Sequence, residues 1–209
     1  MRTKEFRQSS DVVHEGKLRV AAKVVEEQVS ALAEYEKVPI AFRVESQFDI
    51  VPIDNGLGGL RFIETAVVPY VKDYDANENE RPTQWPMRFD VSHWGILSAF
   101  SGTQRAGGVT VAWKTPRLNL LEQREDLVSL WDLRVHPDYR EQGVGHLLFE
   151  HAVAWARVRR CSRMVVETQN INVAACRFYA RQGCELRALN RYAYKESDEV
   201  QLIWHLDLL

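Results

Sequence analysis

The segment that most constrains the fold is Leu127–Gln182, in which strand-like and helix-like stretches alternate twice. Leu127–Val135 and Arg163–Thr168 are typical of strands, and Val144–Arg160 and Val173–Gln182 are typical of helices. A strand, a helix and a second strand in this order require a crossover connection, so the two strands should be parallel. The sequence therefore predicts a β–α–β unit here.

The remaining strands are predicted to pair mainly in an antiparallel manner. Ile40–Val51 and Leu60–Val68 flank DNGLGG, a strong turn signal, and should form a hairpin. A second hairpin is expected from Trp94–Phe100 and Gly107–Trp113, and closing strands from Tyr192–Tyr194 and Glu199–Leu206. The predicted fold class is α+β, with a single mixed central β-sheet flanked by helices.

The N-terminal part gives a different pattern. Residues 1–16 are mostly polar, and we expect them to be flexible. Between Lys17 and Glu36, apolar residues recur every three or four positions, which predicts one helix ending before Pro39. With 209 residues, the chain fits a single domain over residues 17–209.

Composition excludes several classes of protein. Lys and Arg total 27 against 29 for Asp and Glu, so no overall charge favours nucleic acid or an anionic membrane. No apolar run approaches the ~18 residues of a membrane span. The three cysteines form no metal-ligand pattern, and the polar N-terminus lacks a secretory signal. We expect a cytoplasmic protein without a metal site.

The segment Asp132–His146, DLRVHPDYREQGVGH, is the strongest functional signal. A strand ends near Val135, and a glycine-containing turn leads into a helix at Val144. The first amides of a helix are unpaired and carry partial positive charge, so this turn is suited to a pyrophosphate group. A dinucleotide-binding motif needs a third glycine where Leu148 stands, and the Gly-Lys-Ser/Thr of a P-loop is absent.

The pattern V-x-P-x-Y-R-x-x-G-V-G followed by a helix resembles the acyl-CoA-binding motif of the GNAT N-acetyltransferase superfamily. A second stretch, ETQNINVAACRFYARQG at Glu167–Gly183, resembles the helix that follows the next strand in that family. Cys184 stands where the family usually has phenylalanine. The likeness covers roughly residues 92–207, which would form the acyl-CoA-binding core.

Within that superfamily the chain is most similar to streptothricin acetyltransferases. The stretches PYVKDYD at Pro69–Asp75 and EVQLIWHLDL near the C-terminus carry this narrower likeness. Trp131 departs from it by replacing an acidic residue, Arg134 replaces a small one, and the loop at residues 116–127 is longer. These departures affect the acceptor side of the site.

The resemblance implies acetyl-CoA as cofactor and assigns roles to particular residues. Tyr179 would be the general acid, and Asp132 or Glu167 would be the general base, although the two carboxylates could instead only bind the acceptor. An amide within Leu133–Val135 would polarise the thioester carbonyl. The expected cofactor-binding residues are Leu133, Arg134, Val135, Arg140, Glu141, Gln142, Gly143, Val144, Gly145, His146, Asn172, Ala175, Phe178 and Tyr179.

The acceptor is expected to be a small cationic amine. The acidic excursion between Lys72 and Asp90 could attract it, and Tyr70, Tyr74 and Trp131 could add cation–π attraction. The sequence thus predicts an N-acetyltransferase that acts on a primary amine, for which a streptothricin-like antibiotic is the favoured acceptor. A protein or peptide N-acetyltransferase and a non-catalytic acyl-CoA-binding module are the alternatives, and a homodimer is left open.

Overall fold

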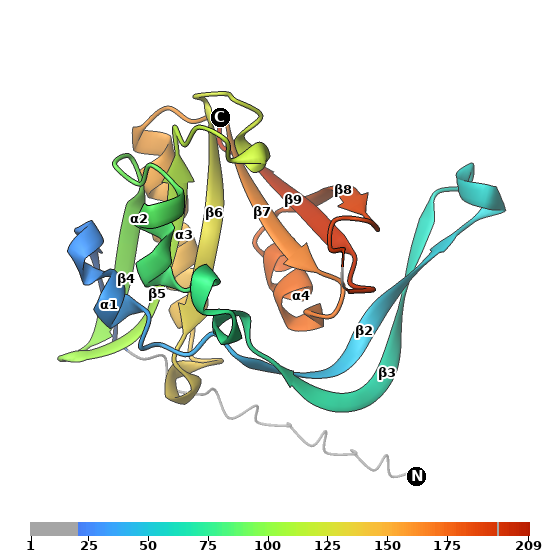
Figure 1. Cartoon of the computed structure of the whole chain (residues 1–209), viewed down its shortest axis with the longest axis horizontal. Helices are drawn as coiled ribbons and strands as arrows, with labels where there is room; N and C mark the ends of the chain where they lie inside the picture. Colours follow the sequence, from blue (N-terminus) through green and yellow to red (C-terminus); the bar gives the residue numbers. More distant parts are fainter. Residues whose placement is uncertain (1–20, 196) are drawn as a thin grey trace, which may run out of the picture.

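The computed structural model describes residues 21–195 and 197–209, and its main feature is a seven-stranded sheet in the order β1-β4-β5-β6-β7-β9-β8 (Figure 1). The strands are β1 (Lys23–Glu27), β2 (Phe42–Pro52), β3 (Leu60–Lys72), β4 (Gly95–Ser101), β5 (Gln104–Trp113), β6 (Leu127–Val135), β7 (Arg163–Gln169), β8 (Glu185–Asn190) and β9 (Gln201–Asp207). The helices are α1 (Leu32–Tyr35), α2 (Trp85–Arg88), α3 (Val144–Val158) and α4 (Val173–Arg181).

The predicted β–α–β unit is confirmed. Strands β6 and β7 pair in parallel and are joined through α3, whereas the other described strand pairs are antiparallel. The mixed sheet flanked by helices confirms the expected α+β class. Both predicted hairpins form, and the second has a tight turn at Gly102–Thr103 rather than a long loop.

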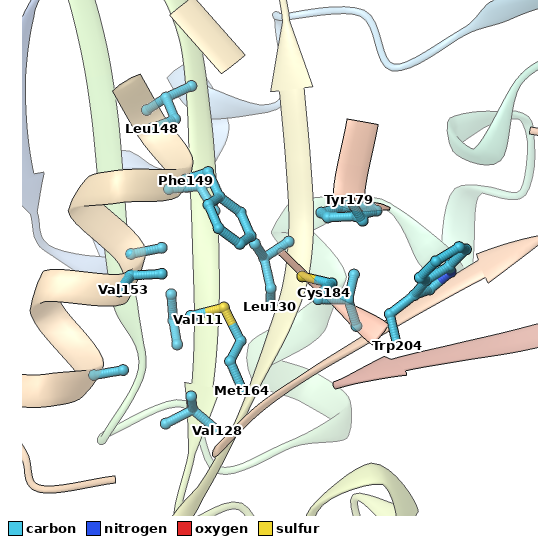
Figure 2. Close-up of a cluster of buried hydrophobic side chains, with 14 of the residues drawn as sticks. Val111, Val128, Leu130, Leu148, Phe149, Val153, Met164, Tyr179, Cys184 and Trp204 are labelled. Atoms are coloured by element: carbon cyan, nitrogen blue, oxygen red, sulfur yellow. The ribbon is translucent and has the colours of Figure 1, made fainter. Parts of the chain in front are cut away.

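Each face of the sheet has its own core. Helices α3 and α4 cover one face, where Leu148 and Tyr179 pack against Val111, Val128 and Leu130 (Figure 2). Helices α1 and α2 cover the other face, where aromatic side chains dominate the packing. This second cluster contains Tyr35, Trp85 and Trp94 together with the half-buried Phe89 and Trp131. We refer to the two sides as the α3/α4 face and the aromatic face.

The β2–β3 hairpin forms a separate two-stranded ribbon that curves away from the main sheet (Figure 1). It is attached where β7 leads into α4: the amide of Phe48 donates to the Asn170 carbonyl (3.0 Å), and the Asn170 side chain donates to the Phe48 carbonyl (3.0 Å). The ribbon therefore brings its last residues and the following segment to the edge of β7.

The helix predicted over Lys17–Glu36 is wrong in its described part. Residues 23–27 form β1, an edge strand paired with β4, and only Leu32–Tyr35 form an α-helix. Val24 packs against the core, so pairing with the sheet overrides the helical spacing. The segment expected to be flexible, residues 1–16, lies outside the described residues.

The closing strand predicted at Tyr192–Tyr194 is also wrong, because these residues form a turn and the strand lies earlier, at β8. A bulge between Leu186 and Ala188 places Leu186 and Leu189 against the same core although they are three residues apart. This spacing breaks the alternation by which a strand is usually identified.

The acidic excursion between Lys72 and Asp90 is more ordered than its composition suggested. It contains α2 and several short 3-10 turns, among them η3 (Tyr74–Ala76), and its Trp85 is buried in the aromatic cluster.

No helix in the described residues is both long and apolar enough to cross a lipid bilayer.

Gly108 of β5 makes a testable contribution to stability. A β-carbon at this position would lie 2.3 Å from the ring of Tyr35, which is fully buried. Gly108→Ala should therefore lower the free energy of unfolding by about 1–3 kcal/mol, the usual cost of overpacking, in urea denaturation. Gly145→Ala is the matched control, because its β-carbon would approach no atom closer than 3.6 Å. Equal losses in the two variants would contradict this account.

Candidate functional site

The site begins where β6 and β7 stop pairing. Their parallel register runs from Leu127 opposite Arg163 to Leu130 opposite Val166, and beyond this point the two strands diverge (Figure 1). Backbone groups of residues 131–135 that face β7 therefore lack a strand partner on that side. The divergence opens the sheet between the strands that carry the two predicted carboxylates.

A β-bulge at Trp131 decides which face each residue of β6 presents. Val111 of β5 pairs with Leu130 and the adjacent Thr110 pairs with Asp132, so Trp131 is an extra residue. In a regular strand, Leu130 and Asp132 would point to the same face. The bulge instead directs Asp132 to the aromatic face, while Leu133 and Val135 pack against the core of the α3/α4 face.

A cavity of about 960 Å³ occupies the opening between the diverging strands. Its wall includes many of the predicted residues, namely Tyr74, Trp131, Asp132, Leu133, Arg134, Glu167, Asn172, Ala175 and Tyr179. The predicted residues Tyr70, Val135, Phe178 and 140–146 are described but do not line it. Tyr70 is 43% exposed on the ribbon, so the structure does not bring it to the cavity.

The predicted phosphate cradle lies at the beginning of α3. Gly143 caps this helix with φ of +88°, Glu141 also has positive φ, and no side chain caps the first turn. The amide of Leu147 donates back to the Gly143 carbonyl (3.0 Å), whereas the amides of residues 144–146 precede the first intrahelical bond. The backbone of this segment is therefore suited to bind an anion.

Several side chains of the cradle are already engaged within the protein. Arg140 donates to the carbonyls of Val135 (3.1 Å) and Ala41 (3.0 Å), and Gln142 donates to the carbonyl of Asp138 (2.5 Å). His146 shares a hydrogen bond with Gln182 (2.7 Å). These side chains hold the loop in place, so the main chain is the part that remains available to a ligand.

Tyr179 reaches the cavity from α4. Its ring packs against Phe149 and Phe178, with centroid separations of 6.1 and 5.2 Å. Burial raises the pKa of the Tyr179 phenol above its ordinary value of 10, so the hydroxyl stays protonated at neutral pH. Within the described chain this hydroxyl has no hydrogen-bond partner, and it is therefore free to donate a proton into the cavity.

Asn172 lies at the N-terminus of α4 and accepts a hydrogen bond from the Ala175 amide (3.0 Å). Its oxygen thus caps the helix, and Asn172, Ala175 and Tyr179 all line the cavity as their helical spacing predicted. Cys176 on the same helix is buried, and burial raises the pKa of its thiol. Cys176 is therefore a poor nucleophile.

A buried ionic cluster surrounds Asp132. Arg134 donates two hydrogen bonds to the Asp132 carboxylate (2.9 and 2.8 Å) and a third to Asp75 of η3 (2.8 Å). The hydroxyl of Tyr35 donates to Asp132 (2.5 Å), and the Arg134 guanidinium lies over the Tyr35 ring (5.2 Å). Sequence reasoning placed Asp75 in the acidic excursion but missed its contact with Arg134, and it missed Tyr35 altogether, because these contacts join residues far apart in the chain.

Glu167 of β7 has a different environment. One carboxylate oxygen accepts a hydrogen bond from the Tyr194 hydroxyl (2.6 Å), and the other accepts from the Gln201 amide (2.8 Å). Among the described residues, no cation lies within ion-pair distance of Glu167. The two predicted carboxylates therefore differ, since Asp132 is balanced by Arg134 whereas Glu167 is held only by neutral donors.

Comparison with known proteins agrees with this architecture. The model of the acetyltransferase (GNAT) family matches residues 61–184, more than half of the chain. The chain belongs to the GNAT family of acetyltransferases. The matched residues include the turn before α3 as well as β6, β7 and α4, which carry much of the cavity wall, whereas Tyr194 and Glu199 of that wall lie beyond the match.

Individual relatives narrow the comparison. A streptothricin acetyltransferase of Escherichia coli is 28% identical over 186 residues, which cover 87% of this chain and 92% of the relative. Streptothricin acetyltransferase A of Bacillus subtilis (strain 168) is 34% identical over 77 residues, which cover 35% of this chain and 44% of the relative.

A candidate streptothricin acetyltransferase of Bacillus anthracis strain Ames, solved with acetyl coenzyme A, has the same fold. Its TM-score is 0.68 at 24% identity, and the match covers 90% of this chain and 99% of that one.

The wall of the cavity carries more acidic than basic side chains, and the acidic excursion contributes several of them. Six carboxylates line the cavity against three cations, and the carboxylates are Asp73, Asp75, Glu80, Asp132, Glu167 and Glu199. Several are balanced: Lys72 pairs with Glu199 (2.5 Å), and Arg88 pairs with Glu80 (2.6 Å). Trp131 and Trp85 add aromatic surface. No cluster in the described residues has the composition of a metal site.

The Arg134 cluster gives a second testable prediction. Arg134→Met would leave Asp132 and Asp75 without their buried cation, so the free energy of unfolding should fall by about 3–5 kcal/mol in urea denaturation. Arg43→Met is the control, because Arg43 pairs with Glu45 at the surface, where a pair contributes less than about 1 kcal/mol. A loss no larger than that of the control would show that the cluster is not stabilising.

Proposed function

We propose that this acetyltransferase uses acetyl-CoA to acetylate a primary amine of a small cationic molecule, with a streptothricin-like antibiotic as the favoured acceptor. The observation that carries the proposal is the cavity itself. At the divergence of β6 and β7 it combines an unbalanced carboxylate, Glu167, with a protonated and unpartnered phenol, Tyr179. Acetyl transfer to an ammonium group needs a base and an acid at one place.

The residues present fit the coenzyme. A β-carbon on Gly145 would make only ordinary contacts with Phe178 and Val135, so packing within the fold does not by itself require a glycine there. The amides of residues 144–146 would hold the pyrophosphate, and the unpaired backbone of residues 131–135 would hold the pantetheine arm. When bound, the coenzyme supplies an activated acetyl thioester.

Glu167 is the stronger candidate for the general base. Both oxygens of Asp132 are engaged by Arg134, so accepting a proton there would disrupt a buried ion pair. A carboxylate has about four lone-pair positions, and Glu167 uses two of them for Tyr194 and Gln201. The remaining positions are available to an ammonium, directly or through water. Asp132 would then shape the acceptor pocket.

Tyr179 would act as the general acid. Its raised pKa keeps the proton in place until a thiolate forms nearby. Backbone amides between Leu133 and Val135 would stabilise the negative charge that develops on the acetyl oxygen. The acidic wall and the aromatic surfaces of Trp131 and Tyr74 favour a cationic acceptor. The names of the relatives in E. coli and B. subtilis support a streptothricin-like one.

The proposal is tested by release of free thiol from acetyl-CoA in the presence of streptothricin, polyamines and amine-bearing peptides. We expect thiol release with streptothricin and an acetylated product detected by mass spectrometry. Turnover with peptides alone would replace the small acceptor by a protein substrate. Coenzyme binding without turnover on any amine would favour a binding module.

Gly145 tests the coenzyme site. Gly145→Val would place a branched side chain at the first turn of α3, and loss of one charge-assisted hydrogen bond to the α3 amides should weaken acetyl-CoA binding roughly tenfold or more. Calorimetric affinity close to that of the unmodified protein would remove this segment from the coenzyme site. An unchanged melting temperature shows that the variant is folded.

Tyr179 tests the chemistry. Tyr179→Phe removes the proton donor but keeps the ring between Phe149 and Phe178, so kcat should fall about 100-fold, within the usual range for general acid catalysis. The dissociation constant of acetyl-CoA should change little in the same variant. If kcat is preserved, another group protonates the leaving thiolate.

A further inference from the structure

A continuous chain of hydrogen bonds ends on Glu167. The hydroxyl of Tyr74 donates to the side-chain oxygen of Gln169, whose amide nitrogen donates to the Tyr194 hydroxyl (2.8 Å). Tyr194 in turn donates to Glu167 (2.6 Å). Every bond in this chain runs in the same direction, from a neutral donor toward the carboxylate. Donors arranged in this way polarise one another and strengthen the final bond.

This row of hydrogen bonds joins segments that are distant in the sequence. Tyr74 belongs to η3 of the acidic excursion, Gln169 ends β7, and Tyr194 lies in the turn between β8 and β9. Tyr74 is held in turn by the ring of Phe42 (5.7 Å) and by Lys72, whose ammonium lies 5.7 Å from its ring centroid. The Glu167 side chain is therefore linked, through these hydrogen bonds, to the position of the acidic excursion.

The two tyrosines remain protonated while they do this. Burial raises the pKa of both Tyr194 and Tyr74 above the ordinary value of 10, and the negative charge of Glu167 acts in the same direction. Both phenols therefore stay protonated at neutral pH and act as hydrogen-bond donors. The last of these hydrogen bonds is donated to the Glu167 carboxylate.

We propose that Tyr194 is a positioning residue that holds the Glu167 carboxylate directed into the cavity, and that Gln169 and Tyr74 connect this function to the acidic excursion. The inference rests on the proposed function, because it assigns Glu167 the role of base. Tyr194 lines the cavity, and in this scheme it contributes to acetyl transfer through its hydrogen bond to Glu167.

The charged and titratable groups around this row of hydrogen bonds affect how acetyl transfer should depend on pH. Besides the two tyrosines, these groups are Glu199 and Cys176, which both lie near Tyr74. Glu199 is paired with Lys72, and Cys176 belongs to α4. Removing the Tyr194 hydroxyl takes one donor from the Glu167 carboxylate and so favours its protonated form. The variant should then need a higher pH to reach full activity.

The test is the pH dependence of kcat/KM for acetyl transfer by Tyr194→Phe. We expect the acidic limb of the profile to move about one pH unit upward, since a hydrogen bond to a charged group is lost. Tyr192→Phe is the matched control, because Tyr192 lies in the same turn but is 90% exposed. A profile that coincides with the control would overturn the proposal, even if the melting temperature falls.

A second variant tests the connection to the excursion. Tyr74→Phe should move the acidic limb in the same direction by a smaller amount, and it carries the test alone if Tyr194→Phe does not fold. In a Glu167→Gln background, Tyr194→Phe should have no further effect on kcat, because both act through one group. Independent losses in the double variant would contradict a positioning role.

These results can be separated from a failure of the proposed function. If the unmodified protein acetylates no amine, the function itself is wrong. If it acetylates an amine but Tyr194→Phe behaves like Tyr192→Phe, only the positioning role is lost. If Glu167→Gln retains full activity, the carboxylate is not the base and the proposal fails while acetyl transfer stands.

Discussion

The site depends on one feature of the sheet, the end of parallel pairing between β6 and β7 at Leu130 and Val166. Once the strands diverge, backbone groups lose their partners, and side chains on both strands face the same opening. The bulge at Trp131 turns Asp132 to the aromatic face and keeps Leu133 in the opposite core. The divergence and the bulge together convert a regular sheet into a lined cavity, because neither strand could present these groups if pairing continued.

Arg134 connects this opening to the rest of the fold. It balances Asp132 on the same strand and Asp75 on the excursion, and it lies over the ring of Tyr35 from α1. Tyr35 in turn fits only because Gly108 has no side chain. A fully buried cation needs such partners, since its desolvation is costly when unpaired. The segments that carry them are therefore held against the sheet.

Local patterns predicted much of this structure from the sequence. The β–α–β unit, the two hairpins and the glycine turn before α3 follow from short-range spacing, and Asn172, Ala175 and Tyr179 line the cavity as helical spacing required. The edge strand β1 was mistaken for a helix because its pairing with β4 leaves no local signal. The contacts of Asp132 with Tyr35 and of Arg134 with Asp75 join residues 97 and 59 positions apart, beyond any local pattern.

The two carboxylates show why long-range contacts matter for chemistry. Sequence alone makes Asp132 and Glu167 equivalent candidates, since each lies on one of two neighbouring strands. In the fold, Asp132 faces a bidentate guanidinium, whereas Glu167 faces a phenol and an amide. A carboxylate fixed by a buried cation is stabilised in place, while one held by neutral donors keeps its charge available to an incoming cation. The acidic excursion contributes to both environments, through Asp75 in the first and Tyr74 in the second, so a single segment of the chain shapes the surroundings of both carboxylates.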